Sequence, residues 1–524
     1  MGSGTSGTAA ALRFADQGIT PCLLDVGIKP PQKKNPFMNL YAYRKKKDCF
    51  SLMIGDEFEA LNNLGPQNKL LPIKLTTPQM GYITAHSEDY SPVEEENFSL
   101  IQSFAQGGLA NAWGAGVYQY TDKELGKFPI KESDLKPYYH RLNQEMGISG
   151  CNDDLTPYFG RDDDLQPPLR LSSNASLIIK KYQRKKSSLN QIGFFLGRPR
   201  LAVLTQEKNG RNPCRYLNLE FWQPLISSIY TPSFTLKRLV KQKKLMYKKG
   251  FLVKSWSEQK QGVAVHAEKV RTKERVTFFC KTLVLAAGAV NSARLVLSKR
   301  KDYHTKLVLL DNPALQFPFV LPSRIGGRLE TDAFGLTQLN CIYDSKAYGL
   351  LQGSILELTS PARAVFFGNF PLAGRDNLKM IRYFLPGLVV MQLFFSAGPR
   401  QGAFLALNQN GKLEIKGDSK HFPPGLIKKV LKIFRKMGAY SLSPLVVKVP
   451  PGHSIHYGGT LPMVCSPQNE YNCTPQGQLY GESCVFVVDG SIFPELGAKN
   501  STFAVMANAM RITDHIVSRL RKNQ

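Results

Sequence analysis

The sequence predicts an α/β fold in which a domain built on a parallel sheet is interleaved with an α+β domain built on an antiparallel sheet. Three observations lead to this expectation. Glycine-rich turns followed by helical patterns occur near both ends of the 524-residue chain and again near residue 288. Short runs of mixed apolar and polar residues replace them between about residues 305 and 450. The expected division is therefore 1–304, with inserted loops at 28–100 and 150–215, then 305–450, then 451–524.

The chain opens with the motif G-x-G-x-x-G, formed by Gly2, Gly4 and Gly7. Apolar residues at helical spacing follow, and a short apolar run from residue 21 then ends near Asp25. In a Rossmann-type site such glycines let a pyrophosphate approach the start of the helix, and the acidic residue accepts hydrogen bonds from ribose hydroxyls. The candidate dinucleotide ligands in this segment are Gly2, Gly4, Thr5, Ser6, Gly7 and Asp25.

This motif normally follows a strand, but only Met1 precedes Gly2. The first strand of a dinucleotide-binding sheet is central, so its loss would expose the edges of its two neighbours. Three explanations are open: the start of the chain is truncated or mis-assigned, the protein is a fragment, or another segment takes the place of the strand. The first explanation is favoured.

Residues 454–516 carry the second pattern. His456 precedes a Gly-Gly loop, in which backbone can come close to a ligand. A short apolar run then ends at Asp489, and apolar residues recur at helical spacing after Asn500. Because the N–H groups at a helix start are unpaired, this end favours an electron-rich or anionic group. An imidazole and a carboxamide could thus flank one pocket.

These patterns, in this order, resemble the signature of the glucose–methanol–choline (GMC) family of flavin oxidoreductases. In that family a His before a Gly-Gly turn lies by the flavin, a strand ending in Asp-Gly-Ser and a Pro follow, and an Asn or His opens the last helix. The resemblance implies FAD as the cofactor. The matching positions are His456, Asp489, Gly490, Ser491, Pro494 and Asn500.

Two internal segments extend the resemblance. The run QGGLANAWGAG from residue 106 looks like the family's segment beside the isoalloxazine ring, and GAVNSARLVL from residue 288 matches its second FAD-binding signature. Val253 lies where the family places a valine whose backbone meets the adenine. The cofactor-binding residues implied by the resemblance are Gly107, Gly108, Asn111, Trp113, Gly114, Val253, Ala287, Gly288, Asn291, Asp489, Gly490, Asn500, Ser501 and Thr502.

The resemblance also implies a reaction, the oxidation of an alcohol CH–OH group by hydride transfer to flavin N5. A neutral imidazole can remove the hydroxyl proton because its pKa lies near the working pH, and His456 is assigned as this base. Asn500 would hold the substrate oxygen through its amide. His453 does not match the family's catalytic position and is assigned either a structural role or a supporting role behind the catalytic residues.

The charge balance favours anionic partners. The net charge is +28, from 68 basic and 40 acidic residues, which suits a phosphorylated substrate, an anionic membrane or nucleic acid. Basic runs are not interleaved with aromatic residues and no nucleic-acid motif occurs, so nucleic acid is not an expected partner. Residues 426–437 form a basic amphipathic pattern that could lie on a membrane, although such patterns more often pack on their own domain.

Targeting and metal-binding patterns are not found in the sequence. The nine cysteines form no C-x-x-C pair, so neither a metal site nor a disulfide framework is expected. No apolar run reaches the length of a membrane span, and no signal-peptide pattern occurs. A cytoplasmic location is expected, with membrane association on the cytoplasmic face as an option.

The main hypothesis is a FAD-dependent alcohol oxidase or dehydrogenase acting on a sugar, polyol or lipid-linked alcohol. The basic surface favours a phosphorylated or membrane-bound substrate. The alternative is a truncated, non-catalytic relative that serves as an accessory or binding protein. The electron acceptor and the oligomeric state have no signature in the sequence.

Overall fold

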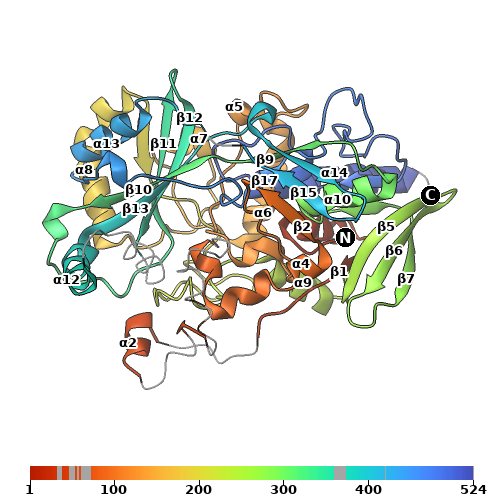
Figure 1. The fold of residues 1–524 in the computed structure, drawn as a ribbon, viewed down its shortest axis with the longest axis horizontal. Coiled ribbons are helices and arrows are strands. Elements are labelled where there is room, and N and C mark those ends of the chain that lie inside the picture. Colours follow the sequence, from red (N-terminus) through yellow and green to blue (C-terminus); the bar gives the residue numbers. More distant parts are fainter. Residues whose placement is uncertain are drawn as a thin grey trace.

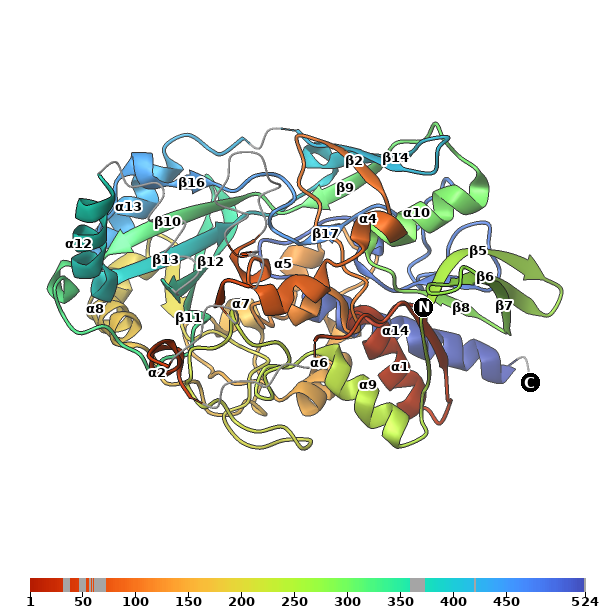
Figure 2. The same cartoon turned by 60° about the horizontal axis from the view of Figure 1, so that its bottom comes forward.

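A computed structural model of the chain describes residues 1–31, 38–46, 53–55, 58, 60, 72–358, 373–418 and 421–522. It has the predicted α/β architecture. One half contains helices α1 (Thr5–Asp16), α10 (Ala289–Arg300) and α14 (Thr502–Lys522) around short parallel strands, and the other half contains an antiparallel sheet with helices against it (Figures 1 and 2). The cavity that holds most of the candidate site residues lies where these halves meet.

Two pairs of parallel strands form the core of the first half. They are β1 (Cys22–Asp25) with β4 (Met246–Lys249), and β8 (Leu283–Leu285) with β18 (Val485–Val487). Met1 lies between the pairs: its amino group donates to the Val284 carbonyl at 2.8 Å, and its carbonyl accepts from Ala286 N at 3.1 Å. Gly2 N donates to the Leu24 carbonyl at 2.9 Å. Met1 and Gly2 therefore join the two pairs at the place where a first strand was expected to be missing.

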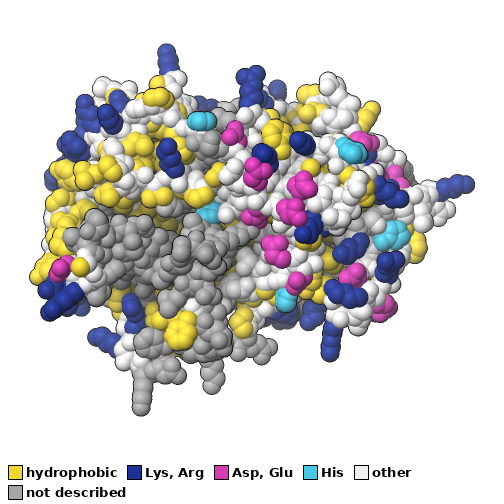
Figure 3. Space-filling model, in the orientation of Figure 1, with side chains coloured by type: hydrophobic (Ala, Val, Ile, Leu, Met, Phe, Trp, Pro, Cys, Tyr) yellow, Lys and Arg dark blue, Asp and Glu magenta, His cyan; other side chains and the backbone are white. Residues whose placement is uncertain are grey.

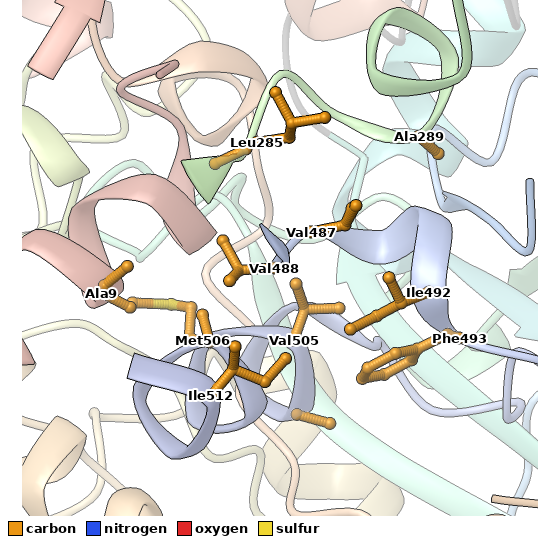
Figure 4. Packing of buried hydrophobic residues seen from close by; sticks show 14 of the residues in the cluster. Ala9, Leu285, Ala289, Val487, Val488, Ile492, Phe493, Val505, Met506 and Ile512 are labelled. Atoms are coloured by element: carbon orange, nitrogen blue, oxygen red, sulfur yellow. The ribbon is translucent and has the colours of Figure 1, made fainter. Parts of the chain in front are cut away.

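Helices pack against these strands through small and aliphatic side chains. The two central helices are α1 (Thr5–Asp16) and α14 (Thr502–Lys522), which lie side by side in Figure 2 and pack closely. Figure 4 shows Ala9 of α1 beside Met506 of α14, with Val487 and Val488 above them. Alanines in this interface allow the close approach, and burial of the larger side chains supplies the hydrophobic stabilisation.

A five-stranded sheet connects the two halves. Its order is β17-β9-β14-β15-β2, with β2 (Val93–Glu96), β9 (Leu307–Asp311), β14 (Ala403–Leu407), β15 (Leu413–Lys416) and β17 (Tyr457–Gly458). The predicted hairpin around Asn410 and Gly411 is confirmed: β14 and β15 pair antiparallel, and Gly411 has φ +75°. Because β17 pairs with the end of β9, the segment carrying His456 lies beside Asp311.

A six-stranded antiparallel sheet dominates the second half, as the sequence predicts. Its order is β16-β10-β13-β12-β11-β3, with β3 (Phe194–Gly197), β10 (Ala314–Val320), β11 (Thr337–Ser345), β12 (Gly349–Glu357), β13 (Leu388–Phe394) and β16 (Val447–Lys448). Side chains alternate across it. One face, including Phe317, Phe319 and Met391, is buried in a core shared with α8 (Ser173–Asn190) and α13 (Leu426–Lys436). The other face carries Gln352 and Gln392 toward the site.

Smaller elements complete the fold. A three-stranded antiparallel sheet contains β5 (Phe251–Gln259), β6 (Gly262–Lys269) and β7 (Arg275–Cys280). The described residues also form the helices α2 (Leu40–Arg44), α4 (Ser87–Tyr90), α5 (Asp122–Leu125), α6 (Glu132–Met146), α7 (Thr156–Phe159), α9 (Pro232–Lys241), α10 (Ala289–Arg300) and α12 (Gly374–Phe384).

Residues 150–215 differ from their prediction as loops, because they contain the 18-residue helix α8 and strand β3. Ser172 caps α8 by accepting a hydrogen bond from Ala175 N at 3.1 Å. Ile178 and Tyr182 are buried on one side of the helix, and a basic run covers the other side. The basic run obscured this periodicity in the sequence.

The amphipathic helix α13 packs on its own domain. Val430, Leu431 and Phe434 are buried in the core with the six-stranded sheet, while its lysines remain exposed. Across the described ranges, no helix is both long and apolar enough to span a bilayer.

Candidate active site

A cavity of about 690 Å³ lies between the parallel strands and the six-stranded sheet. This volume is in the range of cavities that hold cofactors and small molecules. Most of the predicted site residues line it, although they come from widely separated segments. They are Gly2, Gly4, Thr5, Ser6, Asp25, Gly108, Trp113, Gly114, Val253, Ala287, Gly288, Asn291, His456, Asp489, Gly490, Asn500, Ser501 and Thr502.

Three predicted cofactor ligands do not line this cavity: Gly7, Gly107 and Asn111. Asn111 instead donates through Nδ2 to the carbonyls of Gln106 and Gly108, at 2.9 and 2.8 Å. It therefore holds the glycine-rich loop together. Gly107 N donates to Ser3 Oγ at 3.0 Å, which ties this loop to the N-terminal one.

The glycines of the opening motif serve different purposes. A Cβ on Gly7 would lie 2.0 Å from the Gly2 carbonyl oxygen, and one on Gly2 would lie 2.4 Å from the Ala286 carbonyl oxygen. A Cβ on Gly4 meets no atom within 4 Å. Gly2 and Gly7 are therefore required by the turn itself, whereas Gly4 leaves backbone open toward the cavity.

Three helices, α1, α10 and α14, begin at this cavity. Thr5, Ala289 and Thr502, the first residues of these helices, all line it. Each helix start presents unpaired N–H groups and the positive end of the helix dipole. Their convergence favours a ligand that carries negative charge, such as a pyrophosphate.

Asp25 closes β1 at the cavity wall. The Ser3 hydroxyl and the Tyr247 hydroxyl both donate to its Oδ2, Tyr247 from 2.8 Å. Burial raises the pKa of Asp25 to about 6, although these hydrogen bonds act in the opposite direction. Ser3 and Tyr247 were not predicted from the sequence, because only the fold brings them to the carboxylate.

Asp489 organises the neighbouring turns. Its Oδ2 accepts from Gly288 N at 2.9 Å and from the Ser292 hydroxyl, and its Oδ1 accepts from Ser491 N at 3.0 Å and from the Ser491 hydroxyl. The residue is only 2% exposed. Its carboxylate therefore fixes the start of α10 and the turn after β18 from inside the protein.

His456 is partly buried and lines the cavity. Desolvation lowers its pKa to about 4, which differs from the expected value near the working pH, and the imidazole is therefore neutral at neutral pH. Its Nδ1 lies 3.2 Å from Asn312 Oδ1. The ring of Phe394, from strand β13, lies 5.2 Å from the imidazole, measured between centroids.

Asn312 determines which imidazole nitrogen carries the proton. Its Nδ2 donates to the Phe395 carbonyl at 2.7 Å and to the Gly497 carbonyl at 3.0 Å, which fixes the orientation of the amide. Oδ1 is thus the acceptor facing His456, and the proton resides on Nδ1. The lone pair is left on Nε2, as a general base requires.

Asp311 holds the backbone before His456. Its carboxylate accepts from Gly452 N at 2.8 Å and from the Ser454 hydroxyl, and Ser454 Oγ in turn accepts from His456 N at 3.1 Å. Ile455 has φ +59°, which is an unfavourable conformation for a β-branched residue. Such conformations persist where the surroundings impose them, and they cluster at functional sites.

Asn500 precedes α14. Its Oδ1 accepts from Thr502 N at 2.9 Å, so its amide oxygen is engaged by the helix and its Nδ2 is the remaining polar group. The preceding residue, Lys499, is fully buried: its Nζ lies 2.9 Å from Glu124 Oε2 and donates to the Gln119 carbonyl at 2.7 Å. The sequence offered no signal for this ion pair, which anchors the loop carrying Asn500.

The six-stranded sheet provides an uncharged wall. Its side chains in the cavity are Thr337, Gln352, Ser354, Leu356, Gln392 and Phe394. The Asp, Glu, Lys and Arg residues among the described cavity-lining side chains are Asp25, Lys254, Arg294 and Asp489. All four belong to the half that contains the parallel strands and α10.

His453 also lines the cavity, beside Ser454.

No cluster of three or more His, Cys, Asp or Glu side chains suited to a metal ion occurs in the described part of the chain.

Comparisons with known proteins agree with this architecture. Residues 446–509 match the family model of the GMC oxidoreductase C-terminal domain. The crystal structure of pyridoxine 4-oxidase from Mesorbium loti matches with a TM-score of 0.58 at 13% sequence identity, covering 99% of this chain and 98% of that one. No curated protein matches by sequence. The C-terminal segment is therefore similar to that of GMC oxidoreductases, and the chain as a whole shares its fold with pyridoxine 4-oxidase.

Proposed function

We propose that the protein is a FAD-dependent oxidoreductase that oxidises the CH–OH group of a neutral alcohol, with His456 as the base. The observation that carries this proposal is the Asn312–His456 pair at 3.2 Å, which leaves the Nε2 lone pair free on an imidazole at the cavity. Asn500 lines the same cavity and has an amide N–H₂ group available for a substrate oxygen.

The cavity fits FAD by the chemistry of its walls. The α1 start and the open backbone at Gly4 suit a pyrophosphate, and Asp25 suits a ribose. Gly108, Trp113 and Gly114 would face the flavin ring. FAD, when bound, supplies a hydride acceptor.

The chain's own residues would manage the proton and the orientation of the substrate. His456 Nε2 takes the proton of the hydroxyl as the carbinol C–H bond gives up a hydride, and the product is a carbonyl compound. Asn500 Nδ2 donates to the substrate oxygen and holds the carbinol carbon in place. The neutral state of His456 at rest makes it ready to accept the proton.

A neutral substrate is supported by the uncharged wall. Gln352, Ser354 and Gln392 offer hydrogen bonds, and Leu356 and Phe394 offer apolar surface. A phosphorylated substrate, which the basic composition favoured, would find no Lys or Arg among the described side chains of this wall. The class proposed is therefore a sugar, polyol or lipid-linked alcohol whose reacting end is uncharged.

The test is a visible spectrum of the purified protein, followed by anaerobic addition of neutral alcohols. Bound FAD that bleaches in the wild type, and does not bleach in His456→Ala, would support the proposal. Bound FAD that no alcohol bleaches would contradict the assigned reaction. Equal bleaching in both proteins would contradict the role of His456.

The division of the parallel strands into two pairs, β1 with β4 and β8 with β18, favours a second candidate. This candidate is a non-catalytic accessory or binding protein. Hydrogen bonds of Met1 and Gly2, rather than those of a described strand, join the two strand pairs beside the cavity. A colourless protein that does not take up added FAD would support this candidate.

A further inference from the structure

Helices α8 and α13 present an unusually cationic surface. They lie against the same face of the six-stranded sheet, and neither helix contains an acidic residue. Exposed basic side chains project from both: Lys180, Arg184 and Lys185 from α8, and Lys428, Lys429 and Lys432 from α13. Lys186 is also exposed but pairs with Asp154 at 2.6 Å. The opposite sides of the helices are buried, so this surface is fixed in place.

Apolar side chains are exposed directly after α13. Tyr440, Leu442, Leu445 and Val447 are 47%, 66%, 46% and 53% exposed. They belong to a short segment that includes a turn at Ser443–Leu445, which contacts α13, and the edge strand β16. Scattered exposed apolar residues are normal, but four within eight positions form a patch.

The two features adjoin on one side of the molecule. Figure 3 shows hydrophobic side chains gathered in the region of β10 and β13, with Lys and Arg side chains at their margin. Tyr440 pairs with Val320 at the end of β10, and β16 pairs with β10. The exposed apolar segment is therefore held by the sheet edge.

We propose that this cationic–apolar face, formed by the exposed sides of α8 and α13 with residues 440–447, binds an anionic phospholipid bilayer. The lysines and arginines would lie at the headgroups, and Leu442, Leu445 and Val447 would enter the acyl boundary. This differs from the sequence-based expectation for residues 426–437, because the apolar side of α13 is buried and the inserted residues are those that follow it.

The positive charge and the exposed apolar side chains together favour a bilayer as the partner. A protein partner of matching charge would need its own acidic surface, whereas an anionic membrane supplies charge and an apolar interior in one surface. Nucleic acid would engage the basic residues but leave the exposed leucines and valine without a role. The inference does not depend on the proposed reaction, since none of these residues lines the active-site cavity.

The test is co-sedimentation with vesicles of phosphatidylcholine alone and of phosphatidylcholine mixed with phosphatidylglycerol. Wild type should sediment only with the mixed vesicles. Lys428→Glu, Lys429→Glu and Lys432→Glu together should weaken partitioning about a hundredfold or more, from the loss of three surface cations. The matched control reverses Lys241, Lys243 and Lys244, which are exposed on the other half, and it has the same net charge. This control should keep most of the binding.

A second variant tests insertion. Leu442→Ser, Leu445→Ser and Val447→Ser should retain binding at low salt but lose it at physiological salt, where electrostatic attraction is screened. Thermal unfolding of every variant checks that it is folded. Three outcomes would each overturn the proposal. Both triple-lysine variants lose vesicle binding equally, the serine changes leave vesicle binding unaltered, or the protein is retained on duplex DNA but does not bind vesicles. So would a dimer in gel filtration that the serine changes dissociate.

Discussion

Lys499 and Glu124 form an ion pair in the protein interior, with Nζ 2.9 Å from Oε2, one residue before Asn500. Burial lowers the pKa of Lys499, and the Glu124 carboxylate opposes this shift. Thr121 N also donates to the same carboxylate oxygen at 2.8 Å. The pair therefore links the start of α5 to the loop that precedes α14.

Removing one partner of the Lys499–Glu124 ion pair should destabilise the protein. Lys499→Met leaves a buried carboxylate without its cation, and we expect the free energy of unfolding to fall by about 3–5 kcal/mol. Adding Glu124→Gln should recover part of the loss, because the amide keeps an oxygen for Thr121 and removes the charge. Urea unfolding of the single and double variants measures this, and a single variant as stable as wild type would contradict the role of the pair.

The Asn312–His456 hydrogen bond should control the protonation state of the base. Asn312→Leu removes the acceptor for Nδ1–H, so kcat should fall by about 10²–10⁴-fold while FAD content is kept. Asn312→Asp keeps an acceptor but places a negative charge beside the ring, which should raise the pKa of His456. The acidic limb of the pH–rate profile should therefore move to higher pH in Asn312→Asp; an unchanged limb would contradict the assignment.

The low pKa of His456 predicts a wide pH range of activity. Only the neutral imidazole can accept a proton, so activity should be lost as the pH falls through about 4, well below the ordinary value of 6.5. The measurement is kcat/KM against pH with a neutral alcohol. An acidic midpoint near 6.5 would show that the ring is more solvated than its position implies.

The lowered pKa of His456 also predicts that the stability of the protein depends on pH. Between pH 6.5 and about 4 the unfolded chain binds a proton at His456 that the folded chain does not. Stability should therefore decrease as the pH falls through this window, by about 3 kcal/mol from this residue, and the contribution should level off below it. His456→Asn should show a shallower dependence in matched urea titrations.

Two glycine variants should separate folding from cofactor binding. Gly7→Ala places a methyl group 2.0 Å from the Gly2 carbonyl oxygen and should lower the melting temperature markedly. Gly4→Ala meets no protein atom within 4 Å, so it should fold normally but bind FAD more weakly, because the methyl group enters the open cavity wall. If Gly4→Ala keeps the FAD affinity of wild type, a pyrophosphate does not approach there.

Local patterns predicted the elements around the site well. The strand before Asp489, the helix after Asn500 and the hairpin at Gly411 all depend on short-range periodicity and turn residues, and all are present. Helix α8 was predicted as a loop because its basic residues diluted the apolar repeat. The partners of the catalytic candidates could not be predicted: Asn312 is 144 positions from His456, and only the pairing of β9 with β17 brings them together. The same holds for Glu124 and Lys499, whose contact depends on tertiary packing alone.

The position of Met1 has a practical consequence for producing the protein. Its amino group is hydrogen-bonded inside the sheet, between β1 and β8, so any peptide fused before it must run along that seam or displace Met1. An affinity tag placed there would therefore lie close to the glycine motif and the cavity. The far end of α14, where Arg521 and Lys522 are exposed, carries no such constraint. An affinity tag attached after α14 therefore leaves the cavity walls as the fold forms them.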